Sequence, residues 1–268
     1  MQRTLPHRSH TSTWWADATR WRLIAGEILL TGILMILYFF LRGVRPPDIE
    51  SSVSRSLSIV QFEQQMGVFM EVRWQETFLQ YGILMNAANF IYAWMHYPVM
   101  LAIAAWLVIK DPVRFRFWRN VLLVSAIIGV AMYWLIPAAP PRLLGFHGYE
   151  YGFVDTVHGA TSNVAYFQPG PFVNDYAAIP SFHFGWIALA SAAIWVNTSS
   201  KSVRLAAVMM SVVMWWAVVV TGNHFFLDMV FGAGVVAFSW LVVRYMQRFP
   251  IDRWRKKALT PFTARVAL

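Results

Sequence analysis

The chain has 268 residues, of which 58% are hydrophobic and 13% are charged, and its mean hydropathy is +0.48. The charged share is about half that of an ordinary soluble domain. A chain of this length is too short to bury so many apolar side chains in a soluble core. The composition therefore argues against a soluble globular protein and favours a membrane protein. The absence of cysteine excludes disulfides and thiolate metal sites.

Six apolar runs predict membrane-spanning helices, each of which needs roughly 20 mostly apolar residues. In chain order they are Leu23–Leu41, Ile83–Ile109, Val121–Ile136, His183–Val196, Leu205–Thr221 and Phe225–Val243. The second run is long enough to tilt or to begin outside the hydrocarbon, and the fourth is short. We therefore expect an all-α fold: a polytopic membrane protein with a bundle of about six transmembrane helices.

Two segments between these runs are not expected to cross the membrane. Ser51–Gln80 is polar, but its apolar residues recur at roughly helical spacing. This pattern favours one or two amphipathic helices in the membrane interface, with a short soluble cap as the alternative. Pro137–Pro180 is rich in proline and glycine and is expected to be a long loop.

The net charge of +9 is unevenly distributed along the chain. Of the Lys and Arg residues, 17 lie in segments 1–22, 110–119, 198–204 and 244–268, and five lie in 42–81 and 138–182. This bias predicts that both termini are cytoplasmic and that the second pair of segments lies outside. It also favours anionic lipid headgroups, so the charge requires no nucleic-acid partner.

The same pattern predicts how the chain is organised. A cytoplasmic segment, 1–22, precedes the transmembrane domain, 23–246, and a basic cytoplasmic tail follows at 247–268. The first apolar run is too long for a signal peptide, so no cleavable targeting sequence is expected. The protein is expected to be a multi-pass protein of the plasma membrane.

His224 and Asp228 are the first candidate pair for chemistry. They are four residues apart at the start of the sixth run, so they share one helix face. An aspartate that accepts from one imidazole nitrogen leaves the other nitrogen free as a base or nucleophile. The alternative is a purely structural hydrogen-bonded pair.

Two further candidates, His183 and Arg142, are expected near the same outer face. Ser181 is a suitable N-cap for the helix that carries His183, and such a helix start offers free N–H groups to an anion. Arg142 suits bidentate contact with a phosphate. The alternatives are a histidine and an arginine that merely anchor the chain in the interface. Whether these residues meet depends on how the bundle packs.

Other ionisable residues leave different functions open. No compact metal-ligand motif is present, so no metal or cofactor is expected. His96, His147 and His158 are interpreted as mainly structural. Glu27 lies within the first apolar run and has no evident partner, which keeps a transporter or non-catalytic scaffold open as an alternative.

Two segments resemble a known family. Asn174–His183, followed by Phe-Gly-Trp, and Thr221–Asp228 resemble the second and third signature motifs of the type 2 phosphatidic acid phosphatase superfamily. The match is closest to the branch that contains inositol phosphorylceramide synthases, to which Ala139–Leu143 and Gln64–Gln80 are also similar. The resemblance covers roughly residues 55 to 240, and its motifs lie in 137–240.

The chain also departs from the family pattern. Many members carry Ser-Arg seven and six residues before the third-motif histidine, where this chain has Ala217 and Val218. The Lys-rich first motif is absent as well. These departures leave Arg142 and backbone amides to hold the phosphate oxygens.

The resemblance implies a two-step displacement at phosphorus without a metal. His224 would form a phosphohistidine with Asp228 orienting it, and His183 would protonate the leaving oxygen. Arg142 and Ser181 would bind the phosphate. Asn174 and Asn223 would support these residues.

The implied substrate is a lipid phosphate or phosphoinositide at the extracytoplasmic face. Water as acceptor would make the protein a lipid phosphatase, which we favour as the simpler chemistry. A lipid alcohol as acceptor would make it a phosphotransferase. The oligomeric state is left open.

Overall fold

The computed structural model describes residues 18–158, 162, 164 and 170–248. Most of the predicted cytoplasmic segment 1–22 and of the basic tail 247–268 lies outside these residues. The described chain is helical, and its α-helices are α1 (Ala18–Val44), α2 (Ile49–Gln65), α3 (Glu71–Leu79), α4 (Gly82–Phe90), α5 (His96–Lys110), α6 (Pro112–Leu135), α7 (Phe182–Asn197), α8 (Lys201–Val220) and α9 (Phe226–Arg248).

Five helical spans are long and apolar enough to cross a membrane. They are α1, the continuous stretch Gly82–Lys110, α6, α8 and α9, and α7 is a shorter apolar helix of 16 residues. Each of the six predicted runs is therefore helical. The predicted fold, an all-α polytopic membrane protein, is confirmed.

Local sequence explains several helix boundaries. The second span contains a π-helical turn, Ile91–Met95, between α4 and α5, a distortion that often occurs near functional sites. Asp111 caps α6 by accepting from the amides of Val113 and Arg114, and Pro112 occupies the first helical position.

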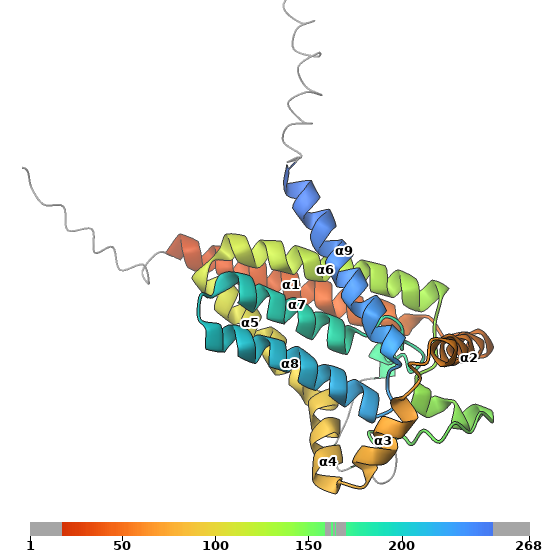
Figure 1. Ribbon diagram of the computed structural model, residues 1–268. Coiled ribbons are helices and arrows are strands. Elements are labelled where there is room, and N and C mark those ends of the chain that lie inside the picture. The colour runs from red at the N-terminus through yellow and green to blue at the C-terminus, as the bar shows by residue number, and fades with distance from the viewer. Residues whose placement is uncertain (1–17, 159–161, 163, 165–169, 249–268) are drawn as a thin grey trace, which may run out of the picture.

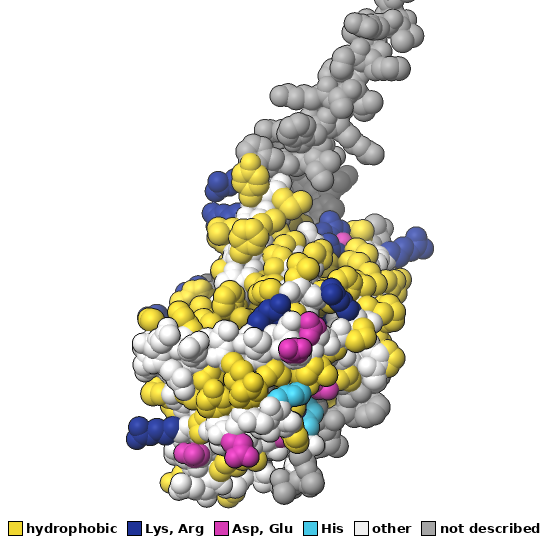
Figure 2. Space-filling view, turned by 90° about the vertical axis from the view of Figure 1, so that its right-hand side faces the viewer, with side chains coloured by type: hydrophobic (Ala, Val, Ile, Leu, Met, Phe, Trp, Pro, Cys, Tyr) yellow, Lys and Arg dark blue, Asp and Glu magenta, His cyan; other side chains and the backbone are white. Residues whose placement is uncertain are grey.

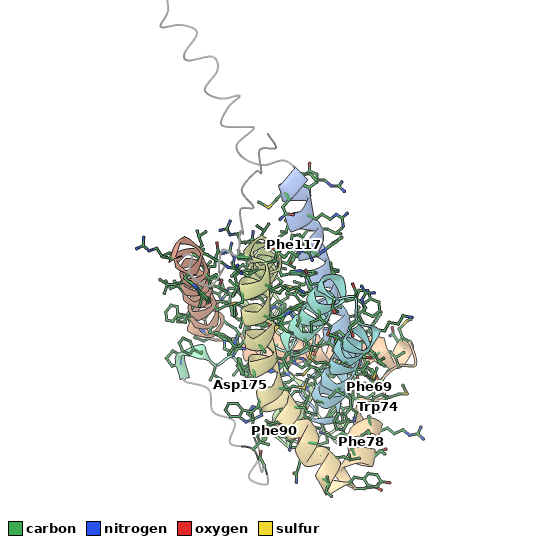
Figure 3. All side chains as sticks on the ribbon, turned by 90° about the vertical axis from the view of Figure 1, so that its left-hand side faces the viewer. Phe69, Trp74, Phe78, Phe90, Phe117 and Asp175 are labelled. Carbon is green, nitrogen blue, oxygen red and sulfur yellow. The ribbon has the colours of Figure 1, made fainter. Side chains whose placement is uncertain are left out.

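The amphipathic segment forms the two helices α2 and α3, which lie at one end of the bundle (Figure 1). Asp48 caps α2 by accepting from the amide of Ser51. The rings of Trp74 and Phe78, labelled in Figure 3, pack edge-on against Trp215 and Trp216 of α8, respectively. The apolar face of α3 is thus used to attach it to the bundle.

The longer helices run side by side, and α9 crosses them obliquely (Figure 1). Large apolar side chains point outward along the bundle; Ile36 on α1, Leu101 on α5 and Ile127 on α6 are 62, 70 and 70% exposed. An apolar exterior of this extent is expected where lipid, not water, surrounds the protein.

Two glycines let α7 and α9 approach closely. A Cβ added at Gly232 would overlap the carbonyl oxygen of Ser181, and one added at Gly185 would lie 2.9 Å from the carbonyl oxygen of Gly232. The amide of Ser181 donates to the carbonyl oxygen of Asp228 at 3.0 Å. Small residues at a helix crossing permit this backbone contact, and here they bring the starts of α7 and α9 together.

Glu27 has partners that the sequence did not reveal. Its carboxylate pairs with Arg116 at 2.6 Å and also with Arg119, both on α6. The acid is therefore part of a structural contact between α1 and α6. The transporter hypothesis rested on an unpartnered acid in this helix, and the pairing removes that support.

Candidate active site

A cavity of about 80 Å³ is lined by the last turns of α1 and α6 and the first turn of α7, which lie at the end of the bundle where Figure 1 shows α2 and α3. Figure 2 looks onto this end, where histidine and acidic side chains lie close together among hydrophobic ones. The polar lining residues of the cavity include Arg142, Asn174, Asp175, His183, Asn223 and His224. Five of the seven residues singled out from the sequence therefore reach one cavity.

His224 is held by Asp228 at the start of α9. Its Nδ1 lies 3.2 Å from Oδ2 of Asp228, and the same oxygen accepts from the amide of Phe225 at 3.0 Å. Asp228 is fully buried. The contact predicted from the four-residue spacing is therefore present, and Nε2 is the ring nitrogen left for chemistry.

His183 approaches from the first turn of α7. Its ring centroid lies 5.9 Å from that of His224, and it stacks on Tyr92 at 4.3 Å and meets the edge of His96 at 4.5 Å. Its Nε2 is buried and has no hydrogen-bond partner among the described residues. Two imidazoles from two helix starts thus face each other, one with a carboxylate partner and one without.

Arg142 lies in a 3₁₀ turn, Pro141–Leu143, that follows α6. Its amide donates to the carbonyl oxygen of Gly222 at 2.8 Å, and its Nε donates to Oδ1 of Asn223 at 2.9 Å. Gly222 has a φ of +68°, a conformation that favours glycine. The arginine is therefore attached to the turn that immediately precedes His224.

Two carboxylates neutralise part of the charge of Arg142. Its Nη1 donates to Asp155 at 2.8 Å, and its Nη2 lies 3.5 Å from Asp175. Burial acts to raise the pKa of Asp155, but hydrogen bonds from His158 and the charge of Arg142 outweigh it and hold that pKa below its usual range. Asp155 is therefore ionised at neutral pH and fixes the guanidinium.

The remaining predicted residues differ in their placement. Asn174 lines the cavity, donates to the carbonyl oxygen of Arg42 at 3.2 Å and accepts from the amide of Tyr176. Ser181 occupies the N-cap position of α7, but its hydroxyl makes no capping bond and is buried outside the cavity lining. Its backbone amide bonds to Asp228, but its side chain does not reach the cavity, and its role in phosphate binding stays a prediction.

Several cavity residues were not found by sequence reasoning. His96 and His158, interpreted as mainly structural, both line the cavity, as do Tyr92 and Arg42. Asp175 carried a signal, because it lies inside the Asn174–His183 motif. The others lie far from either motif and have no spacing that marks them. Within the described part of the chain, no cluster of three or more His, Cys, Asp or Glu residues could hold a metal ion.

A second cavity, of about 230 Å³, lies between α1, α5, α6 and α7. The two cavities share Phe39, His96, Tyr97 and Trp186. Beyond these residues the lining is almost entirely apolar and includes Met35 and Leu107. A polar cavity that contains His183 and His224 thus adjoins an apolar one, and the shape and polarity of the two together suit an amphiphile.

Comparison with known proteins agrees with the motif resemblance. The family model described as the PAP2 superfamily matches residues 57–242. A phosphoinositol dihydroceramide synthase of Bacteroides thetaiotaomicron is 26% identical over 176 residues, which cover 59% of this chain and 55% of that relative. The chain therefore spans about half the length of this curated relative. No solved structure matches the chain.

Proposed function

The chain belongs to the PAP2 superfamily, and from this premise we propose that it is a membrane-embedded enzyme that cleaves a lipid phosphoester through a phosphohistidine. The observation that carries the proposal is the approach of His183 and His224 in one cavity; of these two rings, only that of His224 has a carboxylate on its Nδ1. Such a pair assigns two different roles, a nucleophile and a proton donor.

In the first step, Nε2 of His224 attacks the phosphorus in line with the leaving oxygen. A P–N bond forms as the P–O bond breaks, and protonated His183 gives its proton to the departing alcohol. Asp228 accepts the Nδ1–H of His224 at 3.2 Å and stabilises the positive ring that results. His224 and His183 come from different helices, so attack and protonation can proceed on opposite sides of the phosphorus.

In the second step, the acceptor hydroxyl loses its proton to His183 and its oxygen attacks the phosphorus. The P–N bond breaks and His224 is restored. In both steps the equatorial oxygens carry negative charge, which Arg142 and the first-turn amides of α7 compensate. Asn223 and Asp155 hold the guanidinium in place for this contact.

The adjoining apolar cavity supports a lipid substrate, because a phosphate at the histidines would leave a hydrocarbon chain at residues such as Phe39 and Trp186. It also favours a second candidate function, transfer to a lipid alcohol. His96, which meets the edge of His183, lines both cavities. A hydroxyl on a chain in the apolar cavity would therefore reach His183, the base of the second step. The name of the Bacteroides relative is consistent with such a transfer.

The assay for both candidates uses purified full-length protein in detergent. Radiolabelled phosphatidate, isoprenoid phosphate and phosphoinositide are offered as donors, with and without a long-chain alcohol. Release of free phosphate identifies a phosphatase, and a new labelled lipid identifies a transferase. A chain without turnover on any donor, or a His224→Ala variant as active as the wild type, contradicts the proposed function.

A cavity variant separates the two candidates. Ala104→Phe places an aromatic ring in the apolar cavity. Ala102→Phe is the control, because it places the same ring on the exposed face of the same helix, α5. We expect Ala104→Phe to reduce transfer to the long-chain alcohol at least about ten-fold while hydrolysis of a short-chain substrate changes little, a loss in the range expected for one overpacked site. Equal effects of the two variants would argue against a tail in this cavity.

We also propose that the site faces the extracytoplasmic side, which rests on the distribution of basic residues. Single cysteines at Ser162 and Ser200 of the cysteine-free chain would be probed in intact cells with an impermeant thiol reagent. Labelling is expected at 162 and not at 200, and the reverse pattern would overturn the orientation.

A further inference from the structure

Two buried carboxyl groups that the proposed mechanism does not use lie against the start of α9. Glu63 of α2 is 1% exposed and Glu71 of α3 is 0% exposed. Oε1 of Glu71 accepts from the amide of Phe226 at 2.9 Å, and Oε1 of Glu63 accepts from the next amide, that of Leu227, at 2.8 Å. Because these amides are consecutive, the two carboxyl groups are neighbours.

The second oxygen of each carboxyl group is buried without a hydrogen-bond partner in the described part of the chain. Oε2 of Glu63 and Oε2 of Glu71 are both buried, and neither has a hydrogen-bond partner among the described residues. Buried polar atoms are nearly always paired, so two unpaired acceptors side by side require a cause. If the two carboxyl groups share one proton, both oxygens gain a hydrogen-bond partner, because the protonated carboxyl group donates to the ionised one.

Electrostatics leads to the same arrangement. Adjacent buried carboxylates do not both ionise readily, since each disfavours the charge of the other. Burial and the adjacent carboxyl group of Glu71 raise the pKa of Glu63 to about 9, and the charge of Asp228 on α9 acts in the same direction. These are the titratable groups that face Glu63, and within the described residues neither glutamate forms an ion pair with a basic side chain.

We propose that Glu63 and Glu71 share one proton and that this singly charged pair positions the nucleophile by capping the first turn of α9. The second half of the proposal rests on the function proposed for His224. Asp228 accepts from Phe225, so three successive amides, from Phe225 to Leu227, end on three carboxyl groups. His224 directly precedes these amides, and α2 and α3 thereby fix where its ring lies. Glu63 and Glu71 are positioning residues and do not touch the substrate.

The shared proton gives the protein a defined response to pH. The pKa of Glu63 is raised above its ordinary value of 4.5, so the folded chain holds a proton that the unfolded chain releases. The stability that this group contributes is complete below pH 4.5 and is lost as the pH rises through about 9. Above that pH two buried carboxylates repel each other and the start of α9 loses its cap.

The test uses Glu63→Gln, Glu71→Gln and the double variant, with Glu76→Gln as the control because Glu76 is exposed on the same helix α3. A single glutamine keeps one donor and one negative charge in the pair. The double variant has two amides and no charge. We expect each single variant to lose less than about ten-fold in kcat and the double variant about 100-fold, with KM little changed, because unpaired buried groups cost in this range.

Two readouts do not depend on turnover. Wild-type protein at pH 7.5 should show an infrared band of a protonated carboxylic acid that is absent from Glu63→Gln and present in Glu76→Gln. The unfolding temperature of the wild type should fall progressively between pH 4.5 and about 9, where only the folded chain holds the proton, whereas that of Glu63→Gln should stay level over this range.

The outcomes separate the two proposals. No acid band in the difference between wild type and Glu63→Gln, or the same fall in unfolding temperature for both, overturns the shared proton. A kcat in the double variant equal to that of the wild type overturns the positioning role. If the band is present but His224→Ala retains turnover, the proposed function fails while the shared proton stands.

Discussion

The starts of α7 and α9 each place a histidine in the same cavity, but they differ in how their first amide groups and their histidine are hydrogen-bonded. At α9 the amides of Phe225, Phe226 and Leu227 end on carboxyl groups, and His224 itself is bound to Asp228. At α7 the cap residue Ser181 makes no capping bond, and Nε2 of His183 has no partner among the described residues.

This difference indicates which of the two helix N-termini can bind an external anion. The positive end of α9 is already compensated by carboxylates, so it fixes a side chain and does not attract a phosphate. The positive end of α7 carries no such group in the described part of the chain. This contrast supports the proposal that the nucleophile comes from the start of α9 and that the phosphate binds beside the start of α7.

The largest expected effect comes from removing either histidine. His224→Ala deletes the attacking nitrogen and should lower kcat by about 10⁴-fold or more, as for other covalent nucleophiles. Labelled substrate followed by alkaline quench should give an acid-labile phosphate on the wild type and none on this variant.

His183→Ala should be severely impaired with a lipid substrate and much less with a nitrophenyl phosphate, whose leaving group needs no proton. Equal losses on both substrates would contradict the division of roles between the two helix starts. A labelled adduct on His224→Ala with near-normal turnover would place the nucleophile elsewhere.

Changing Asp228 tests whether the cap of α9 matters for chemistry as well as for folding. Asp228→Asn keeps the shape but no longer orients or stabilises the ring of His224, which should lower kcat by about 10²- to 10⁴-fold. The phosphohistidine should still form, though slowly, in single-turnover trapping. An unchanged kcat would show that the contact between His224 and Asp228 has a structural role only.

The close approach of α7 and α9 should be sensitive to a single methyl group. Gly232→Ala collides with the carbonyl oxygen of Ser181, whereas Gly234→Ala, two residues on, meets nothing within 4 Å. We expect the first to destabilise the protein by about 1–3 kcal/mol, as overpacking does. It should also lower kcat by separating the two histidines. Thermal unfolding and kinetics of the two variants check this, and equal stabilities would disprove the contact.

The smallest expected effect is that of a chelator. Arg142 and the amides of α7 are proposed to compensate the phosphate, so EDTA should change the rate less than about two-fold, within the scatter of such assays. A loss of turnover that one divalent ion restores would show that phosphate binding at the start of α7 needs a metal. It would overturn the proposal that Arg142 and the amides of α7 compensate the phosphate charge.

Sequence patterns predicted local features of this molecule well. Apolar runs located the six helices, because lipid imposes a length and a composition on each. The fourth run, His183–Val196, corresponds to α7, Phe182–Asn197. The His224–Asp228 contact followed from helical spacing alone. The π-helical turn at Ile91–Met95 left no comparable signature.

Features that depend on packing could not be predicted in the same way. The approach of His183 to His224 requires Gly185 and Gly232 to face each other across two helices, and one sequence does not reveal that pairing. Glu27 has its partners 89 and 92 residues away, and Glu71 meets Phe226 at a separation of 155. Such pairs have no fixed spacing, so only the fold reveals them.

The position of α1 in the molecule has a consequence for how the protein can change over evolution. This helix precedes the region 57–242 that matches the family, yet Tyr38, Phe39 and Arg42 line the polar cavity and Met35 lines the apolar one. Its end is joined to the site by the hydrogen bond from Asn174, a residue of the polar cavity, to the carbonyl oxygen of Arg42 at 3.2 Å. The two histidine motifs and one wall of the paired cavities thus occupy separate stretches of chain. If the proposed lipid tail lies in the apolar cavity, substitutions in α1 would alter which hydrocarbon chain is accepted while both histidine motifs remain intact.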